Sequence, residues 1–443
     1  MEYSIPPTGA LPSLETVLSE FEADSDIASE LGIPPPTPTP SIADESSVRM
    51  SGSGGGGSIM RYSMLQGIST QLSSAADRIN AGLASSCSVC SHYFAVGTSH
   101  GHILNFDVTQ TLRWAHQDKN GQGAVSSMSY NPECNRLLAG FARGLVIMLD
   151  TQSGDVMRQL FDVVTPNTGV LHIKWTSRAA MALAADSGGS VWSLSFTRKL
   201  GVRGCSTRCL FSGARGEVCA VEPLLSQTRE HHDLDQYCIV ALATLSKYFI
   251  VTIRPRLKVI KYHLLQGPPD CLPVLAWQMV LIQAADTTRS VDPVLVVGRG
   301  NQLFFHQLFI SHGRITLLLL RHITMQTNLL SAHWLGPKCV GCLDTSEILH
   351  LLDVRSSKEL ECIDLANAGM VYGSAQFKGL ATGGNVSPAL ALAGTHACYN
   401  SLACRGVQLY ILGSRTMHSI GVRTWMERIT YLVSISGSNG KVF

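Results

Sequence analysis

The chain has 443 residues, of which 45% are hydrophobic and only 15% charged, against about 25% in a typical soluble domain. No apolar run reaches the ~18 residues that a membrane-spanning helix needs, which excludes a transmembrane protein of that kind. Residues 50–443 hold 33 bases and 23 acids, a balance too dilute to favour nucleic acid as a partner.

Cysteine usage and the first residues together predict the compartment. The segment MEYSIPPTGALPSLE lacks the basic start and apolar block of a secretory signal. The 13 cysteines are an odd number, and we expect them to be reduced thiols in a cytosolic chain without disulfides.

Residues 1–58 are predicted to be a disordered, acidic leader. The first 49 residues hold nine acids and one base, and the segment also contains PPPTPTP and SGSGGGGS. Such a composition buries too little apolar surface to offset the entropy of ordering. Within the leader, Ser13 is placed as an N-cap, and apolar residues recur at helical spacing: Leu11, Leu14, Val17, Leu18 and Phe21. This pattern fits a short helix that folds onto a partner, and it fits equally well a transient helix without one.

Residues 59–83 are predicted to form one amphipathic helix. The apolar positions follow one another at steps of three or four residues: Met60, Met64, Leu65, Ile68, Leu72, Ala75, Ala76 and Ile79. The polar face carries serine, threonine and glutamine, whereas helices that lie on membranes usually carry Lys and Arg there. We therefore expect the helix to pack against the domain that follows.

From residue 90 onward, short β-branched and aromatic runs alternate with glycine-containing turns, which is typical of an all-β protein. Three segments, 93–107, 136–150 and 181–196, share a strand, tight turn, strand pattern. Their turn glycines Gly101, Gly144 and Gly189 lie 43 and 45 residues apart, close to the ~40–45 residues of a WD-type propeller blade. Weaker copies begin near residues 241, 294, 338 and 389. The sequence thus predicts a seven-bladed WD-type β-propeller over residues 90–420, with a double-layered β-sandwich array as the alternative.

Motifs that would indicate chemistry are better explained by structure. Residues 97–101 match the G-x-S-x-G nucleophile elbow around Ser99, but HILNFD follows and predicts a second strand where an elbow needs a helix. The pairs Cys87/Cys90 and Cys339/Cys342 have zinc-ligand spacing but lie far apart in the chain, and buried cysteines commonly act as small hydrophobes. We expect no enzyme activity, no cofactor and no metal. Arg254, Arg256 and Lys258 alternate with apolar residues, so a strand would align three cations on one face, either for an acidic partner or anionic lipid or simply for solvent.

Several long segments resemble the family of vacuolar protein sorting-associated protein number eight. They are PSLETVLSE (12–20), SIMRYSMLQGISTQLSSAADRINAGL (58–83), AVGTSHG (95–101), DSGGSVWSLSF (186–196), RCLFSGARGEVCAVEPL (208–224) and FKGLATGGNVSPALALAGTHACY (377–399). The resemblance implies a subunit of the CORVET tethering complex, which bridges early endosomal membranes before fusion. It also implies a propeller that faces an early-endosomal Rab GTPase, class C vacuolar sorting subunits as further partners, and a cytoplasmic location peripheral to early and late endosomes.

The resemblance ends within residues 421–443. Residues 422–432 look like the start of the helix that leads into the α-solenoid of the family, and the polar tail VSISGSNGKVF follows. We therefore expect a truncated form or short isoform. The zinc-binding RING domain and the ubiquitin-ligase activity of the family are not carried over.

The predicted mechanism is recognition without chemistry, through residue types that dominate interfaces. The candidate contact residues are Arg143, Arg215, Arg254, Arg256, Lys258, Trp192 and Tyr248. Two other classes of function remain open. One is a generic propeller scaffold of a coat or ubiquitin-adaptor assembly, and the other is a hydrolase that uses Ser99.

Overall fold

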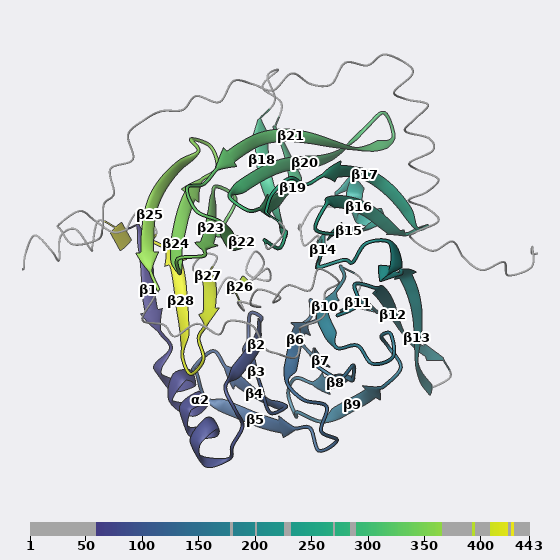
Figure 1. Ribbon diagram of the computed structural model, residues 1–443, viewed down its shortest axis with the longest axis vertical. Coiled ribbons are helices and arrows are strands. Elements are labelled where there is room, and N and C mark those ends of the chain that lie inside the picture. The colour runs from purple at the N-terminus through teal and green to yellow at the C-terminus, as the bar shows by residue number, and fades with distance from the viewer. Residues whose placement is uncertain are drawn as a thin grey trace, which may run out of the picture.

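A computed structural model describes residues 59–423, apart from 178–179, 200–201, 226–231, 269–270, 284–288, 366–391 and 395–407, together with Glu427 and Arg428. Over these residues the strands form seven antiparallel four-stranded sheets arranged as a ring (Figure 1). The predicted seven-bladed propeller is confirmed. None of the described helices is long and apolar enough to span a membrane.

Blades 1 to 3 follow one another in chain order, each as a simple up-and-down meander. Blade 1 has β2 (Ala84–Val89), β3 (Tyr93–Thr98), β4 (His102–Asp107) and β5 (Leu112–Gln117). Blade 2 has β6 (Val125–Tyr130), β7 (Arg136–Phe141), β8 (Val146–Asp150) and β9 (Val156–Leu160). Blade 3 has β10 (Val170–Trp175), β11 (Met181–Asp186), β12 (Val191–Lys199) and β13 (Val202–Phe211), and the short helix η1 (Gly213–Arg215) follows.

Blades 4 to 6 repeat the same up-and-down meander. Blade 4 has β14 (Ala220–Pro223), the short helix η2 (Asp233–Gln236), β15 (Cys238–Ala243), β16 (Lys247–Arg254) and β17 (Lys258–Leu264). Blade 5 has β18 (Val274–Gln283), β19 (Arg289–Arg299), β20 (Gln302–Ser311) and β21 (Arg314–Thr324). Blade 6 has β22 (Leu329–Trp334), β23 (Cys339–Asp344), β24 (Ile348–Asp353) and β25 (Lys358–Asp364).

Blade 7 joins the two ends of the ring. Its strands β26 (Leu392–Gly394), β27 (Gln408–Leu412) and β28 (Met417–Val422) come from the C-terminal side, and β1 (Met60–Met64) pairs with β28 from the N-terminal side. The register runs from Met60 opposite Val422 to Met64 opposite His418. The ring is therefore closed by hydrogen bonds between residues more than 350 positions apart.

The structure corrects the single helix expected over residues 59–83. Residues 60–64 are strand β1, and the helix α2 is confined to Gln66–Arg78. The apolar spacing did not distinguish the two, because the open edge of β28 recruits Met60–Met64 through pairing that local propensity cannot encode. Ile68 and Leu72 of α2 are buried beside Phe94 of blade 1 and Tyr410 of blade 7, so the helix covers the closing seam.

The turns that marked the repeat have the expected geometry. Gly101, Gly144 and Gly189 each lie between the second and third strands of a blade, with φ of +80°, +95° and +79°. Glycine adopts this left-handed conformation without the steric cost that a Cβ imposes. The predicted period of the turn glycines is therefore confirmed as a period of blades.

Each hydrophobic core is shared by two neighbouring blades. Seven clusters are present among the described residues, and every one draws its side chains from two blades that are adjacent in the ring. The first strands of successive blades also contact one another around the ring, ending with β26 against β2. No blade buries its own faces, so each depends on both neighbours.

Blade 5 departs from the common pattern. Its strands have 10 or 11 residues, whereas those of blades 1 and 2 have five or six. β20 pairs with β19 only up to Gln307, but it continues to pair with β21 up to Ser311. The β20–β21 hairpin thus extends beyond its sheet toward β17 of blade 4 (Figure 1).

The seam predicts a difference between two methionines of β1. Met60 is 2% exposed in the core between blades 6 and 7, whereas Met64, four residues on, is 38% exposed. Replacing Met60 by Ala should lower the free energy of unfolding by about 2–5 kcal/mol, and Met64→Ala by no more than about 0.5 kcal/mol. Urea denaturation of both variants measures this, and equal losses would contradict closure through a packed β1.

Candidate interaction surface

Three of the predicted contact residues lie together at the tip of one hairpin. β16 ends at Arg254 and β17 begins at Lys258, so Arg254, Arg256 and Lys258 flank a turn. The expected single strand is thereby corrected, because Pro255 has no backbone N–H to continue the ladder. The Oγ1 of Thr252 lies 3.1 and 3.4 Å from the carbonyl oxygens of Arg256 and Lys258 and holds the turn. All three cationic side chains are exposed.

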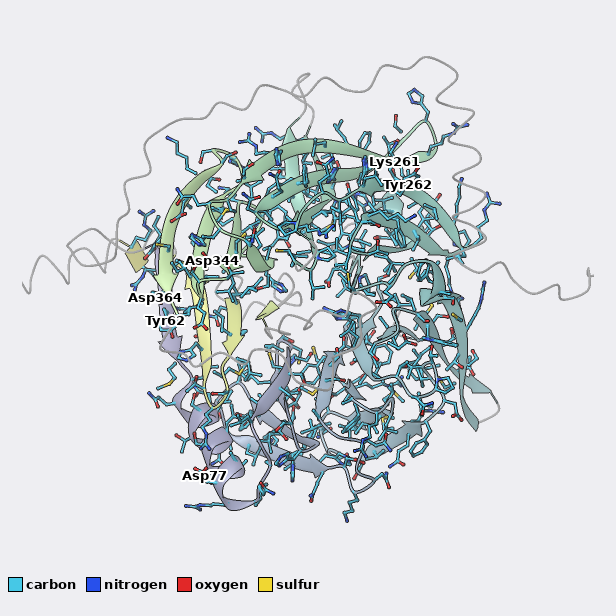
Figure 2. All side chains as sticks on the ribbon, viewed as in Figure 1. Tyr62, Asp77, Lys261, Tyr262, Asp344 and Asp364 are labelled. Atoms are coloured by element: carbon cyan, nitrogen blue, oxygen red, sulfur yellow. The ribbon has the colours of Figure 1, made fainter. Side chains whose placement is uncertain are left out.

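The tip belongs to a larger basic surface, which we call the basic rim. It consists of the two outer hairpins, residues 247–264 of blade 4 and 302–324 of blade 5. Together they contain seven Lys and Arg residues and no Asp or Glu: Lys247, Arg254, Arg256, Lys258, Lys261, Arg314 and Arg321. The outermost strands β17 and β21 are in contact, and Lys261 lies on the outside of the ring (Figure 2). The formal charge of the rim, +7, therefore exceeds the net charge of the whole chain, +2.

Apolar side chains are exposed on the same rim. Leu318, Leu319 and Leu320 of β21 are 50%, 51% and 41% exposed. β21 is the last strand of its sheet, and no described strand pairs with its outer edge. Successive residues of a strand point to opposite faces, so three exposed leucines in a row mean that this edge is open on both. Exposed apolar edges of this kind are sites of association.

The other predicted contact residues do not join this surface. Arg143 is exposed in the β7–β8 turn of blade 2, and its Nη1 donates to the carbonyl oxygen of Gly121 at 2.8 Å. Arg215 ends η1 in the blade 3 to blade 4 connection, and its side chain lies outside the described residues. Trp192 of β12 is half-buried, and its Nε1 donates to Asp186 at 3.1 Å. None of the three lies on either hairpin of the basic rim.

Tyr248 is corrected from a contact residue to a buried one. It is 2% exposed, and its hydroxyl lies 3.0 Å from Nε2 of His306 across the junction of blades 4 and 5. Its ring stacks on His263 at a centroid distance of 5.3 Å, and His263 lies 5.5 Å from His306. Sequence reasoning could not find this cluster, because Tyr248 and His306 are 58 positions apart.

Burial sets the protonation of the cluster. It lowers the pKa of His306 to about 3, with a further contribution from His263, and it raises the pKa of Tyr248. The pKa of His263 is lowered by burial and by the charge of Lys261. Both histidines are thus neutral near neutral pH, and the cluster joins two blades without adding charge to the basic rim.

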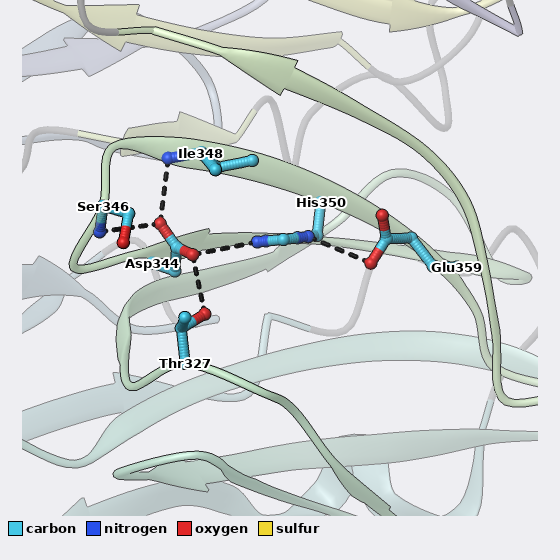
Figure 3. Close-up of polar contacts among 6 residues, drawn as sticks. All are labelled: Thr327, Asp344, Ser346, Ile348, His350 and Glu359. Atoms are coloured by element: carbon cyan, nitrogen blue, oxygen red, sulfur yellow. Dashed lines mark hydrogen bonds and ion pairs between the residues drawn. The ribbon is translucent and has the colours of Figure 1, made fainter. Parts of the chain in front are cut away.

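The densest ionic cluster of the described residues surrounds Asp344 (Figure 3). Its carboxylate accepts hydrogen bonds from Thr327 Oγ1 at 2.6 Å and from the backbone N–H groups of Ser346 and Ile348 at 2.9 Å. His350 Nε2 lies 3.1 Å from Asp344, and its Nδ1 lies 3.1 Å from Glu359. The buried Asp344 therefore ties the β23–β24 turn to the preceding loop and to β24.

Electrostatics favours the protonated form of His350 and the ionised forms of its two carboxylate partners. Burial would lower its pKa, but hydrogen bonds and charges from Glu359 and Asp344 outweigh burial and raise it. The pKa of Glu359 is lowered chiefly by its hydrogen bond to His350. Burial would raise the pKa of Asp344, but its hydrogen bonds outweigh that and lower it.

A second cluster identifies the structural role of the first. Asp186 occupies the β11–β12 turn and accepts from Thr165 Oγ1 at 2.6 Å, from the N–H groups of Gly188 and Ser190, and from Trp192. In both clusters an aromatic ring contacts the aspartate from six residues further along the chain. It is His350 for Asp344 and Trp192 for Asp186. Because an indole has no acid–base chemistry near neutral pH, the shared arrangement clamps a blade turn.

The remaining motifs also lie in structural positions. Ser99 lies in the turn between β3 and β4, and its Oγ accepts from the N–H of Leu83 at 3.1 Å. Two strands flank it, so the strand-to-helix elbow is absent at this serine. Cys87 lies in blade 1, whereas Cys339 and Cys342 lie in blade 6. Within the described part of the chain, no group of three or more metal-ligating side chains is present.

Comparison with known proteins points in one direction. The Vps8 beta-propeller family matches residues 58–421. The chain is 76% identical to a Vacuolar protein sorting-associated protein 8 homolog of Drosophila melanogaster and 39% identical to one of Mus musculus. The alignments cover 98% of this chain but only 35% and 32% of those proteins, so the chain spans about a third of their length.

A solved structure shares the fold at low identity. The Cps50 (Swd1) β-propeller domain of Myceliophteria thermophila superposes with a TM-score of 0.53 at 12% identity. The match covers 77% of this chain and 97% of that one, and it concerns the propeller architecture alone.

The two histidines on blades 5 and 6 predict opposite responses to acid. For His350, the raised pKa stabilises the fold fully below the ordinary histidine pKa of 6.5, and this stabilisation is lost as pH rises through the folded-state value. The paired carboxylates contribute fully above their ordinary values of 3.8 and 4.5. His350→Gln should therefore cost most stability between about pH 4.5 and 6.5. Urea denaturation across pH measures this, and a loss independent of pH would contradict it.

His306→Gln should show the reverse trend. The unfolded chain takes up a proton at His306 below pH 6.5, whereas the folded chain does so only near pH 3. The wild-type protein thus loses stability at this site as the pH falls, and the variant does not. The stability of His306→Gln relative to wild type should rise as the pH falls from 6.5 to 4.5. That of His350→Gln should instead fall as the pH is lowered toward 6.5, and it should stay low between 6.5 and 4.5. Parallel trends would rule out the neutral assignment of His306.

Proposed function

The chain belongs to the Vps8 β-propeller family, and we propose from this membership that it is a non-enzymatic subunit of the machinery that tethers vesicles during vacuolar protein sorting. The named homologues support the sorting role. In the proposal, the chain acts with class C vacuolar sorting subunits of a CORVET-type complex. It lies in the cytoplasm, held peripherally on early and late endosomes through its partners.

The basic hairpin tip is the proposed contact for an early-endosomal Rab GTPase. Arg254, Arg256 and Lys258 are exposed on a pinned turn, and the two outer hairpins around them carry no acid. Such a tip favours an acidic partner surface and accelerates its association. The switch segments of GTPases are ordered by the γ-phosphate, so a partner surface that includes them would be complete only with GTP bound.

The single observation that carries this site is the absence of acids from the basic rim. A solvated strand face usually mixes both signs of charge, and mixed signs give no preference for an acidic partner. The rim keeps seven cations without one carboxylate across two blades. It is therefore the part of the described surface on which a positive potential adds up over two neighbouring hairpins.

Charge reversal at the tip tests the contact. Arg254→Glu, Arg256→Glu and Lys258→Glu combined should weaken binding of the GTP-loaded GTPase by about tenfold, from three exposed pairs of about 0.5 kcal/mol each. The dependence of affinity on salt should also become smaller, because fewer ion pairs form. Titration calorimetry with the GTPase in a non-hydrolysable GTP analogue and in GDP measures both effects.

The matched control reverses three other exposed lysines: Lys119, Lys338 and Lys358. It changes the net charge equally but lies on blades 1 and 6, so it should leave the affinity near that of the wild type. Equal loss in both variants would assign the effect to net charge. Equal binding of the GTP and GDP forms would favour a generic propeller scaffold, as in a coat or ubiquitin-adaptor assembly.

A further inference from the structure

The edge of β21 is an incomplete surface. Leu318, Leu319 and Leu320 are about half exposed, and no strand of the described chain pairs with their outer side. Unpaired apolar edges are normally shortened, charged or covered, because they otherwise pair with other chains. β21 has 11 residues and is among the longest described strands, so it is not blunted by length. We therefore expect another segment or molecule to pack on this edge.

The cations around the edge define the chemistry of that cover. Lys261 on β17 and Arg314 on β21 are exposed on either hairpin of the basic rim. Arg321, one residue after the leucines, donates from Nη1 to the Oγ of Ser357 in blade 6 at 2.7 Å. The residues of both hairpins provide no carboxylate. A complementary ligand needs apolar side chains for the leucines and acids for the flanking bases.

The leader of the same chain combines both properties. At 100° per residue in a helix, the side chains of Leu11, Leu14, Leu18 and Phe21 fall within one stripe. Glu15 and Glu22 then border this stripe, seven residues apart and on the same side. The first 49 residues carry nine acids and one base, so electrostatic attraction to the basic rim acts over the whole leader.

We propose that residues 11–26 dock as an acidic amphipathic helix on the β21 edge of their own chain. The apolar stripe packs on Leu318, Leu319 and Leu320, in the manner of a helix that lays its apolar face on a complementary surface. The glutamates on its border face the cations of the basic rim. The leader thereby covers the one long apolar edge that the ring leaves open among the described strands.

The segment between the docking helix and β1 is long enough to reach the β21 edge. Residues 27–58 separate the docking segment from β1, which enters the ring in blade 7, two blades from blade 5 (Figure 1). Thirty-two residues span at most roughly 105–115 Å and about 28–34 Å on average as a flexible chain. A domain of this size has a radius of gyration of about 21 Å. The tether therefore reaches blade 5 and keeps the local leader concentration near the mM range.

A second copy of the ring fits the edge less well than the leader. Pairing two β21 edges would bring two acid-free, cationic hairpin pairs together, which costs electrostatic free energy. The leader brings the opposite charge and is present at every edge by covalent attachment.

Hydrogen exchange on the full 443-residue chain tests the proposal. Leu14→Asp with Leu18→Asp should make the amides of residues 11–21 and of β21 exchange about tenfold faster than in the wild type, because the local opening free energy falls by ~1.4 kcal/mol. The matched control, Ile27→Asp with Ile33→Asp, adds the same two charges to the leader outside the stripe. It should exchange as the wild type does. Neither variant touches the ring, so misfolding of the propeller does not confuse the result.

A reciprocal pair of ring variants places the docking site. Leu318→Ser with Leu320→Ser should release the protection of residues 11–21, whereas Val108→Ser, at an exposed turn of blade 1, should not. Identical exchange in the stripe and control variants would overturn the proposal. Protection of β21 from exchange that disappears on dilution would also overturn it, because the edge would then be covered by a second copy. Protection of β21 that arises only with anionic vesicles would overturn it too. The assay contains no GTPase, so its outcome is independent of the proposed Rab contact.

Discussion

Ring closure is the constraint on which the rest of this structure depends. Every hydrophobic core lies between two blades, so a blade buries both of its faces only if both neighbours are present. Six junctions join blades that follow one another in the chain, but the seventh joins blade 7 to blade 1, so Tyr410 must meet Phe94, and β1 must pair with β28 to complete blade 7. The pairing of β1 with β28, covered by α2, therefore completes the cores of blades 6, 7 and 1 at once.

The same constraint explains where the molecule is free to vary. The inner parts of each sheet must match their neighbours, whereas the outer ends of long strands contribute little to closure. Blade 5 varies at this outer level. Its β18–β19 and β20–β21 hairpins separate beyond Val294 and Gln307. At the point of separation, the carboxylate of Asp292 contacts the side chains of Ser290, Gln307 and His232. The basic hairpin tip and the leucine edge both lie at this outer level. Interaction surfaces can therefore change without breaking a junction between blades.

Much of the architecture was accessible from sequence because it is local and periodic. A strand, a glycine turn and a second strand are encoded within about 15 residues, and their repetition gives the seven blades. Pairing across the whole chain is not encoded locally, which is why Met60–Met64 looked helical. Alternation suggested that Arg254, Arg256 and Lys258 share a strand face, but Pro255 breaks the ladder and a turn gathers them instead. Tyr248 resembled a surface anchor because its partner, His306, comes from the next blade.

Charge segregation links the two proposed surfaces. The chain is nearly neutral as a whole, yet residues 1–49 hold nine acids and one base, and the outer hairpins of blades 4 and 5 hold seven bases and no acid. The hairpin tip and the β21 edge belong to neighbouring strands, β17 and β21, which are in contact. A leader docked on β21 would place its glutamates beside the cations that an acidic partner needs. Partner binding and leader release would then be coupled, and such coupling is reciprocal. Under that coupling, a partner binds only those chains whose leader has left the rim. The measured association constant then equals the intrinsic one multiplied by the fraction of such chains.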